Sequence, residues 1–310
     1  MAKYLLCIAV ALSLSCAPER TNYQPGAQEI LNLQIITTLG PSLNQSRPLY
    51  SPKAIAVNRL KEIYIADYGN DRIVKLDSSY AVAKEIGGFG SSEYDLSGPV
   101  SLALDKISNV YVIDSGNRRA VRFDRYLNFI SANDGFEKDE KISFVRPVSV
   151  DISDRGDILV GDEGLGACYK LDQFFAYIYE FGSQNDIQPV NVPASIAHGD
   201  DNRIYVADSD YGKIFVYDDL GLLLKTIGED ILQKPTSVAV SKNSGIWVAD
   251  EETGFIHCFN YRGEEIFRWN GSGSQNLLKP TGLFIDSDDL LYIVDSSTAR
   301  VYITRPIIRK

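Results

Sequence analysis

A proline followed fifteen residues later by an aspartate occurs six times in this chain, and no other feature constrains its fold as strongly. The pairs are Pro52 and Asp67, Pro99 and Asp114, Pro147 and Asp162, Pro193 and Asp208, Pro235 and Asp250, and Pro280 and Asp295. Successive prolines are 42 to 48 residues apart, so length varies only after each aspartate, as surface loops vary around a fixed core. The chain therefore contains six copies of one structural unit.

Each unit contains four predicted β-strands. In the first unit, residues 54–57, 62–67 and 72–77 are rich in β-branched and aromatic residues and alternate with period two. A fourth run, residues 81–87, follows a turn near Asp77. Four strands every 42 to 48 residues is the spacing of a β-propeller blade.

The two ends of the chain are predicted to complete one blade together. Only five residues follow Arg305, so the sixth unit lacks its fourth strand, whereas residues 33–40 resemble the fourth strands of other units. We therefore expect an all-β, six-bladed β-propeller of four-stranded antiparallel blades, closed when the N-terminal strand 33–40 completes the last blade. The propeller would span residues 33–305, and residues 306–310 would form a tail.

The repeat resembles that of the NHL family, most closely in the first unit. The matching residues are Pro52, Tyr64, Ala66, Asp67, Asn70, Arg72 and Ile73. The third unit departs most, with Ala167 in the position of Arg72. The resemblance implies a rigid disc that binds proteins or ligands. Six-bladed relatives also include amidating lyases with a histidine-bound zinc and lactonase-like hydrolases with a carboxylate-lined metal site.

The N-terminus has the pattern of an export signal. Lys3 precedes an apolar run from Tyr4 to Leu14 that is too short to span a bilayer. The residues before Cys16 resemble a bacterial lipobox, with Ser13 where leucine is expected. We expect a signal peptide at residues 1–15, lipidation of Cys16, a linker at residues 16–32, and attachment of a monomer to the outer membrane or cell surface by this lipid alone. The alternative is a soluble secreted protein in which Cys16 is incidental.

The net charge argues against binding of nucleic acid, and the positions of the cysteines argue against a disulfide. The formal net charge of −10 would repel nucleic acid, so we expect none to bind. Cys168 and Cys258 fall at non-equivalent positions of units three and five, too far apart for a disulfide, and are predicted to be unpaired.

Because an aspartate recurs at the same position in all six units, we expect the six aspartates to have a structural role. One carboxylate in each unit at a fixed offset is expected to cap a turn, or to pair with a cation five residues later, such as Arg72, Arg119 or Lys213. His198 and His257 occupy slots that hold valine or leucine in other units, so core packing is expected for both. No catalytic residue and no metal-binding set is predicted.

Asp151 is the one candidate for chemistry in the channel. Its equivalents in four other units are Ala56, Ala103, Ala197 and Ala239. The carboxylate could contact a ligand or a divalent cation in the channel, or it could be solvated by channel water. No other cofactor is predicted.

The loops supply the predicted binding surface. Connections from the fourth to the first strand and from the second to the third strand gather on one face of a propeller. Aromatic and arginine side chains there suit a protein or peptide partner. The candidates are Tyr68, Phe89, Tyr94, Arg118, Phe136, Arg146 and Tyr211. The alternatives are a lyase or lactonase activity in the channel, and recognition of cell-envelope glycans, which the 18 tyrosines suggest.

Overall fold

The computed structural model describes residues 29–40, 43, 47–138, 140–241, 243–272 and 275–309. The predicted signal peptide, Cys16 and residues 17–28 of the predicted linker lie outside these residues. Among the described helices, none is long and apolar enough to cross a membrane.

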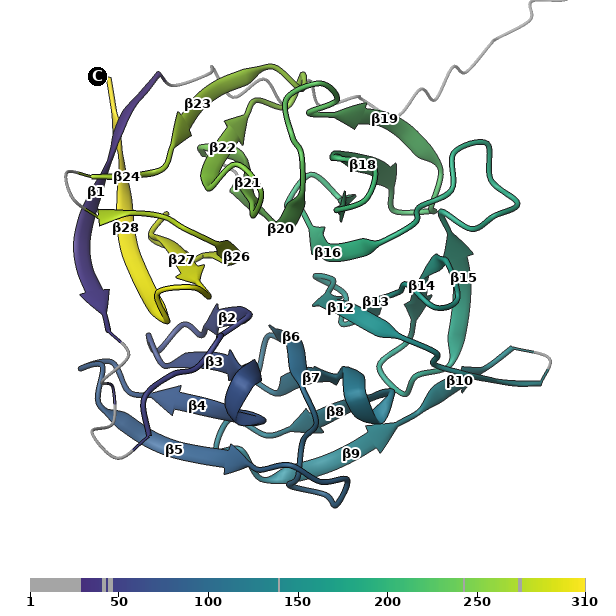
Figure 1. Cartoon of the computed structure of the whole chain (residues 1–310). Coiled ribbons are helices and arrows are strands. Elements are labelled where there is room, and N and C mark those ends of the chain that lie inside the picture. The colour runs from purple at the N-terminus through teal and green to yellow at the C-terminus, as the bar shows by residue number, and fades with distance from the viewer. Residues whose placement is uncertain are drawn as a thin grey trace, which may run out of the picture.

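Six four-stranded antiparallel sheets form a ring around a central axis (Figure 1). Blade one contains β2 (Ala54–Val57), β3 (Ile63–Asp67), β4 (Arg72–Leu76) and β5 (Val82–Gly87). Blade two contains β6 (Pro99–Leu104), β7 (Val110–Asp114), β8 (Arg119–Phe123) and β9 (Phe129–Asn133). Blade three contains β12 (Pro147–Ile152), β13 (Ile158–Asp162), β14 (Ala167–Leu171) and β15 (Tyr177–Phe181).

The remaining blades repeat this arrangement. Blade four contains β16 (Pro193–His198), β17 (Arg203–Asp208), β18 (Lys213–Asp218) and β19 (Leu223–Ile227). Blade five contains β20 (Pro235–Ser241), β21 (Gly245–Asp250), β22 (Phe255–Phe259) and β23 (Glu265–Trp269). Blade six contains β26 (Pro280–Ile285), β27 (Leu291–Asp295), β28 (Arg300–Ile308) and, outermost, β1 (Ile30–Leu39). The predicted fold class is thus confirmed.

Two short hairpins and two 3₁₀ turns complete the described structure. The hairpins are β10 (Gly135–Glu137) with β11 (Lys141–Ser143), and β24 (Gly271–Ser272) with β25 (Gln275–Asn276). The 3₁₀ turns are Tyr68–Asn70 and Ser115–Asn117, each directly after the second strand of its blade.

Ring closure involves longer strands than the sequence indicated. β1 begins at Ile30, and β28 continues to Ile308, so most of the expected tail is part of the sheet. The two strands are antiparallel, with Ile30 opposite Ile308 and Leu39 opposite Val301. Leu33 of β1 is buried in a cluster that includes Trp247 and Trp269 of blade five. The closing strand is therefore fixed both by backbone pairing and by apolar burial.

The small residues near the axis join neighbouring blades. The hydroxyl groups of Ser101, Ser195 and Ser237 accept backbone N–H bonds from Val150, Val238 and Leu283 of the next blade, at 3.2, 3.2 and 2.9 Å. The Ser149 hydroxyl donates to the Pro193 carbonyl of blade four at 2.7 Å. Serine at this position thus supplies a hydrogen bond between blades.

Candidate functional site

The six repeated aspartates fasten the loops on one face of the ring. Each is fully buried at the end of the second strand of its blade and accepts one or two N–H bonds from the segment that precedes the innermost strand. The donors are Tyr50 to Asp67, Ser97 to Asp114, Val145 and Arg146 to Asp162, Asn191 and Val192 to Asp208, Gln233 and Lys234 to Asp250, and Leu278 and Lys279 to Asp295. These bonds place both sets of loops on the same side, which we call the loop face.

Arginine supports this carboxylate in blades one and two. Arg72 Nε is 2.7 Å from Asp67, its Nη1 is 2.7 Å from Glu85, and its Nη2 donates to the Arg47 carbonyl at 2.7 Å. Arg119 Nε is 2.8 Å from Asp114. The expected partner in blade four behaves differently, because Lys213 pairs with Glu229 at 3.1 Å.

Four predicted binding residues line one depression of about 650 Å³ over blades one to three. They are Tyr68, Phe89, Arg118 and Arg146. Phe89 is 83% exposed, and Tyr68 follows β3 with 41% of its surface exposed. Arg118 ends a 3₁₀ turn with a φ of 53°, and Arg146 precedes β12. We call this surface the loop-face depression.

The prediction for Phe136 was wrong, because this side chain is only 3% exposed. The segment between blades two and three folds back as the β10–β11 hairpin instead of forming an open loop. Phe136 lies on it, with its ring centre 4.6 Å from that of Tyr169 and 6.0 Å from that of Phe144. It belongs to the apolar core at the junction of blades two and three.

Tyr94 and Tyr211 are exposed but lie outside the depression. The ring of Tyr94 is 6.4 Å from Phe123 and 6.3 Å from Phe129, and its hydroxyl accepts the Phe129 N–H at 3.3 Å. Tyr94 therefore fastens the loop before β6 to the outer part of blade two. Tyr211 projects from the β17–β18 turn of blade four, with its ring near that of Phe215.

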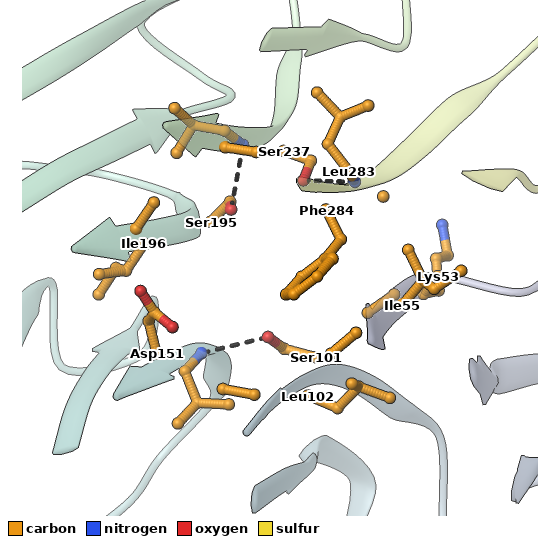
Figure 2. A pocket seen from close by; sticks show the side chains of 18 of the residues that line it. Lys53, Ile55, Ser101, Leu102, Asp151, Ser195, Ile196, Ser237, Leu283 and Phe284 are labelled. Carbon is orange, nitrogen blue, oxygen red and sulfur yellow. Dashed lines mark hydrogen bonds between the residues drawn. The ribbon is translucent and has the colours of Figure 1, made fainter. Parts of the chain in front are cut away.

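The central channel encloses about 240 Å³ and is lined by the innermost strand of every blade. Figure 2 shows Phe284 pointing into this space, with Asp151 across from it. Lys53 precedes β2 and therefore lies at the loop-face end. Asp151 is the fifth residue of β12 and lies deeper.

The carboxylate of Asp151 is largely enclosed by protein. It accepts the backbone N–H of His198 at 2.7 Å. Burial raises the pKa of Asp151 to about 6, although the N–H bonds from His198 and Ile152 act in the opposite direction. An acid with this pKa exchanges its proton slightly below neutral pH.

The histidines do not form a metal site with this acid. The side chain of His198 is 6% exposed, and its Nε2 is 3.9 Å from Asp219. Burial lowers the pKa of His198, so the ring is neutral at pH 7. His257 Nδ1 lies 2.7 Å from Glu265 in blade five. Within the described part of the chain, no group of three or more histidine, cysteine, aspartate or glutamate side chains is arranged to hold a metal ion.

Sequence reasoning missed a group of cations at the loop-face mouth of the channel. Lys234 and Lys279 both contact Glu251, at 3.0 and 3.1 Å. Burial lowers the pKa of Lys53, Glu251 raises it, and the nearby ammonium groups of Lys279 and Lys234 lower it further. The sequence held one signal, since residues at the position of Lys53 in the other units are uncharged.

Comparison with known proteins identifies the architecture. No model of a protein family matches the sequence, and no curated protein matches it. A streptogramin B lyase structure has a TM-score of 0.63 at 13% identity, covering 90% of this chain and 100% of that one.

Two further solved structures are similar in the same way. The virginiamycin B lyase from Staphylococcus aureus with quinupristin has a TM-score of 0.62 at 13% identity, covering 90% and 88% of the two chains. The β-propeller domain of Cps50 (Swd1) from Myceliophteria thermophila has a TM-score of 0.62 at 10% identity, covering 89% and 100%. At these identities the likeness shows the fold, and the chain is a β-propeller.

Proposed function

We propose that this protein is an exported, lipid-anchored β-propeller that binds a protein or peptide partner through its loop-face depression. The observation that carries the proposal is the convergence of Tyr68, Phe89, Arg118 and Arg146 on one concave surface. Aromatic and arginine side chains contribute most to protein recognition, because they combine large apolar area with directed hydrogen bonds.

Exposure of Phe89 supports this assignment. Phe89 is 83% exposed, and Val145, which also lines the depression, is 46% exposed. An apolar segment of a partner that covers this surface removes it from water, which stabilises the complex by about 25 cal/mol for each Å² of apolar surface buried.

The glycan alternative has less support, because many tyrosines are core residues. Those among the largest fully buried side chains are Tyr64, Tyr111, Tyr205, Tyr217 and Tyr302.

The depression is held in shape before any partner arrives. The segments that carry Phe89 and Arg146 end in N–H bonds to buried Asp114 and Asp162. Asp71 accepts the N–H of Gly98 at 2.7 Å and so ties blade one to the loop before β6. A rigid site loses little conformational entropy on binding, which favours affinity.

The path of β1 suits an anchored disc. β28 runs from Arg300 at the loop face to Ile308 at the opposite face, and Ile30 is paired with Ile308. A tether that precedes Ile30 therefore joins the propeller on the side away from the depression. Attachment through Cys16 would leave the loop face directed toward partners.

Site-specific photocrosslinking tests the binding surface. A photoreactive phenylalanine analogue at position 89 should give a discrete crosslinked product in intact cells. The same analogue at position 107, where Ile107 is 74% exposed on the opposite face, should not. Equal crosslinking at both positions, or none at position 89, would contradict the proposal.

Metabolic labelling tests the anchor separately. The wild-type chain should incorporate a labelled fatty acid and sediment with membranes, whereas Cys16→Ala should do neither. Unlabelled wild-type protein free in the medium would reject lipid anchoring without affecting the binding surface.

A lyase activity in the channel is the second candidate, favoured by the enclosed Asp151 beside the backbone of His198. One similar structure is described as a virginiamycin B lyase that is catalytically inactive after replacement of a histidine by alanine. Turnover of virginiamycin B by the wild-type protein, lost in His198→Ala, would support this candidate. No turnover by folded wild-type protein would exclude that substrate.

A further inference from the structure

Cations gather at the loop-face mouth of the channel, although the chain as a whole carries a net charge of −10. We call Lys53, Lys234 and Lys279 the channel-mouth lysines. They come from the segments that lead into β2, β20 and β26, so blades five, six and one each contribute one ammonium group.

The channel-mouth lysines outnumber the carboxylates that contact them. Glu251 is shared by Lys234 and Lys279, and its side chain is 11% exposed. Lys53 has no carboxylate within 4.0 Å among the described residues; its ammonium nitrogen lies 5.8 Å from the centre of the Tyr68 ring. The cluster is therefore left with excess positive charge next to a cavity.

Lys53 is also partly removed from water. Lys53 lines the channel, and burial lowers its pKa against the opposing effect of Glu251, with a further lowering by the ammonium groups of Lys279 and Lys234. An ammonium group in such a place gains more from an anionic partner than one in bulk water does, because the interaction is less screened.

The channel-mouth lysines lie next to the loop-face depression. Tyr68 lines the loop-face depression, and Lys53 lies over its ring. Arg118 and Arg146 line the same depression. Phe284 points into the channel below, as Figure 2 shows, so a ligand group that reaches Lys53 would be held near the mouth.

We propose that the channel mouth binds an anionic group, a carboxylate or a phosphate, on the peptide segment that occupies the loop-face depression, with Lys53 as its main charge partner. This inference rests on the proposed function and adds the chemistry of the ligand. The apolar part of the segment would cover Phe89, while its anion would lie beside Tyr68 at the channel mouth.

Selection from a random peptide display library tests the proposal with the full propeller as bait. Wild-type protein should enrich peptides that combine an apolar residue with an acidic residue or a free carboxyl terminus. Lys53→Met should enrich apolar peptides without the acidic preference. Lys106→Met is the matched control, because it removes one positive charge from the opposite face, and it should select as the wild type does.

Synthetic versions of an enriched peptide then identify the anion. With wild-type protein, replacing its glutamate by glutamine should weaken binding about tenfold, as expected for loss of a charge-assisted hydrogen bond. With Lys53→Met the same replacement should have almost no effect. A phosphoserine version that binds more tightly than the glutamate version would assign a phosphate ligand, and the reverse order a carboxylate.

Two results would overturn the proposal, and they differ from each other. Peptides that need Phe89 but bind equally with glutamate or glutamine would remove the anion site and keep the proposed function. Failure to select any peptide whose binding is lost in Phe89→Ala would remove the proposed function and, with it, the ligand chemistry. An unchanged unfolding midpoint of Lys53→Met serves as the folding control.

Discussion

At the residue scale, buried charged side chains stabilise the loops of the loop face. Arg72 is 2% exposed and bonds Asp67, Glu85 and the carbonyl of Arg47 at once. Removing one partner of a buried pair leaves an uncompensated charge, which costs more than the pair contributes.

Arg72→Met should therefore lower the free energy of unfolding by about 3 to 5 kcal/mol, because Asp67 stays buried without its cation. Lys213→Met is the matched control at the equivalent position of blade four. Lys213 pairs with Glu229, whose side chain is 63% exposed, so its loss should cost less than about 1 kcal/mol. Urea unfolding measures both, and equal costs would refute the assigned role of Arg72.

Asp151 should make stability depend on pH. Its pKa is about 6 in the folded protein and 3.8 in a free chain, so the folded state binds the proton more tightly. The ionised carboxylate therefore destabilises the protein above pH 6, and this cost disappears as pH falls toward 4. Asp151→Asn should raise the free energy of unfolding at pH 7 by about 2 kcal/mol and leave it nearly unchanged at pH 4. A stability gain of the same size at both pH values would contradict this account.

At this scale the sequence predicted which residues are equivalent between units, but not which individual side chains contact one another. The period of the repeat places the six aspartates in equivalent positions. Because every unit has one, a structural role was predicted for them and a catalytic role was not. Burial of Phe136 was missed because the length of a loop does not reveal that it folds into a hairpin. The channel-mouth lysines were missed because Lys53, Lys234 and Lys279 belong to different units and become neighbours only when the ring closes.

At the element scale, the innermost strands join the blades through short polar contacts. The hydroxyl of Ser237 accepts the N–H of Leu283 from the next blade at 2.9 Å in a buried environment. Every unit has a small residue at this position, namely Ala54, Ser101, Ser149, Ser195, Ser237 or Gly282. The hydrogen bond could not be predicted, because the partner strand is 46 residues away.

Ser237→Ala should lower the free energy of unfolding by about 1 to 3 kcal/mol, because the buried N–H of Leu283 loses its acceptor and alanine cannot replace it. Ser91→Ala, at an exposed position of the loop before β6, should change stability by less than about 0.5 kcal/mol. Thermal or urea unfolding compares the two variants. A neutral Ser237→Ala would show that the inter-blade bond adds nothing to stability.

The strands themselves were the most predictable elements. The β-branched and aromatic residues of the second strands, such as β3 and β7, are buried on both faces, because each sheet packs against neighbouring blades on both sides. The proline that begins each unit tolerates the loss of its N–H at an inner edge. The ends of β1 and β28 were less predictable, because Pro306 and the residues beyond it pair only with the other end of the chain.

At the scale of the whole molecule, β1 closes the ring by joining both ends of the chain in blade six. The sheet of blade six contains strands from both ends of the chain, and Leu33 packs beside Trp247 and Trp269 of blade five. Without β1, the outer edge of β28 would be unpaired and this apolar cluster would be open to water. The loop-face depression spans blades one to three, and the channel mouth spans blades five, six and one, so closure at blade six brings the two sites together on one face.

Hydrogen exchange of the full chain in its native state tests this closure most directly. The amides of β1 that pair with β28 should exchange as slowly as those of the central strand β21, because opening the ring requires cooperative unfolding. Rapid exchange throughout β1 while β21 stays protected would contradict a ring closed by the N-terminal strand.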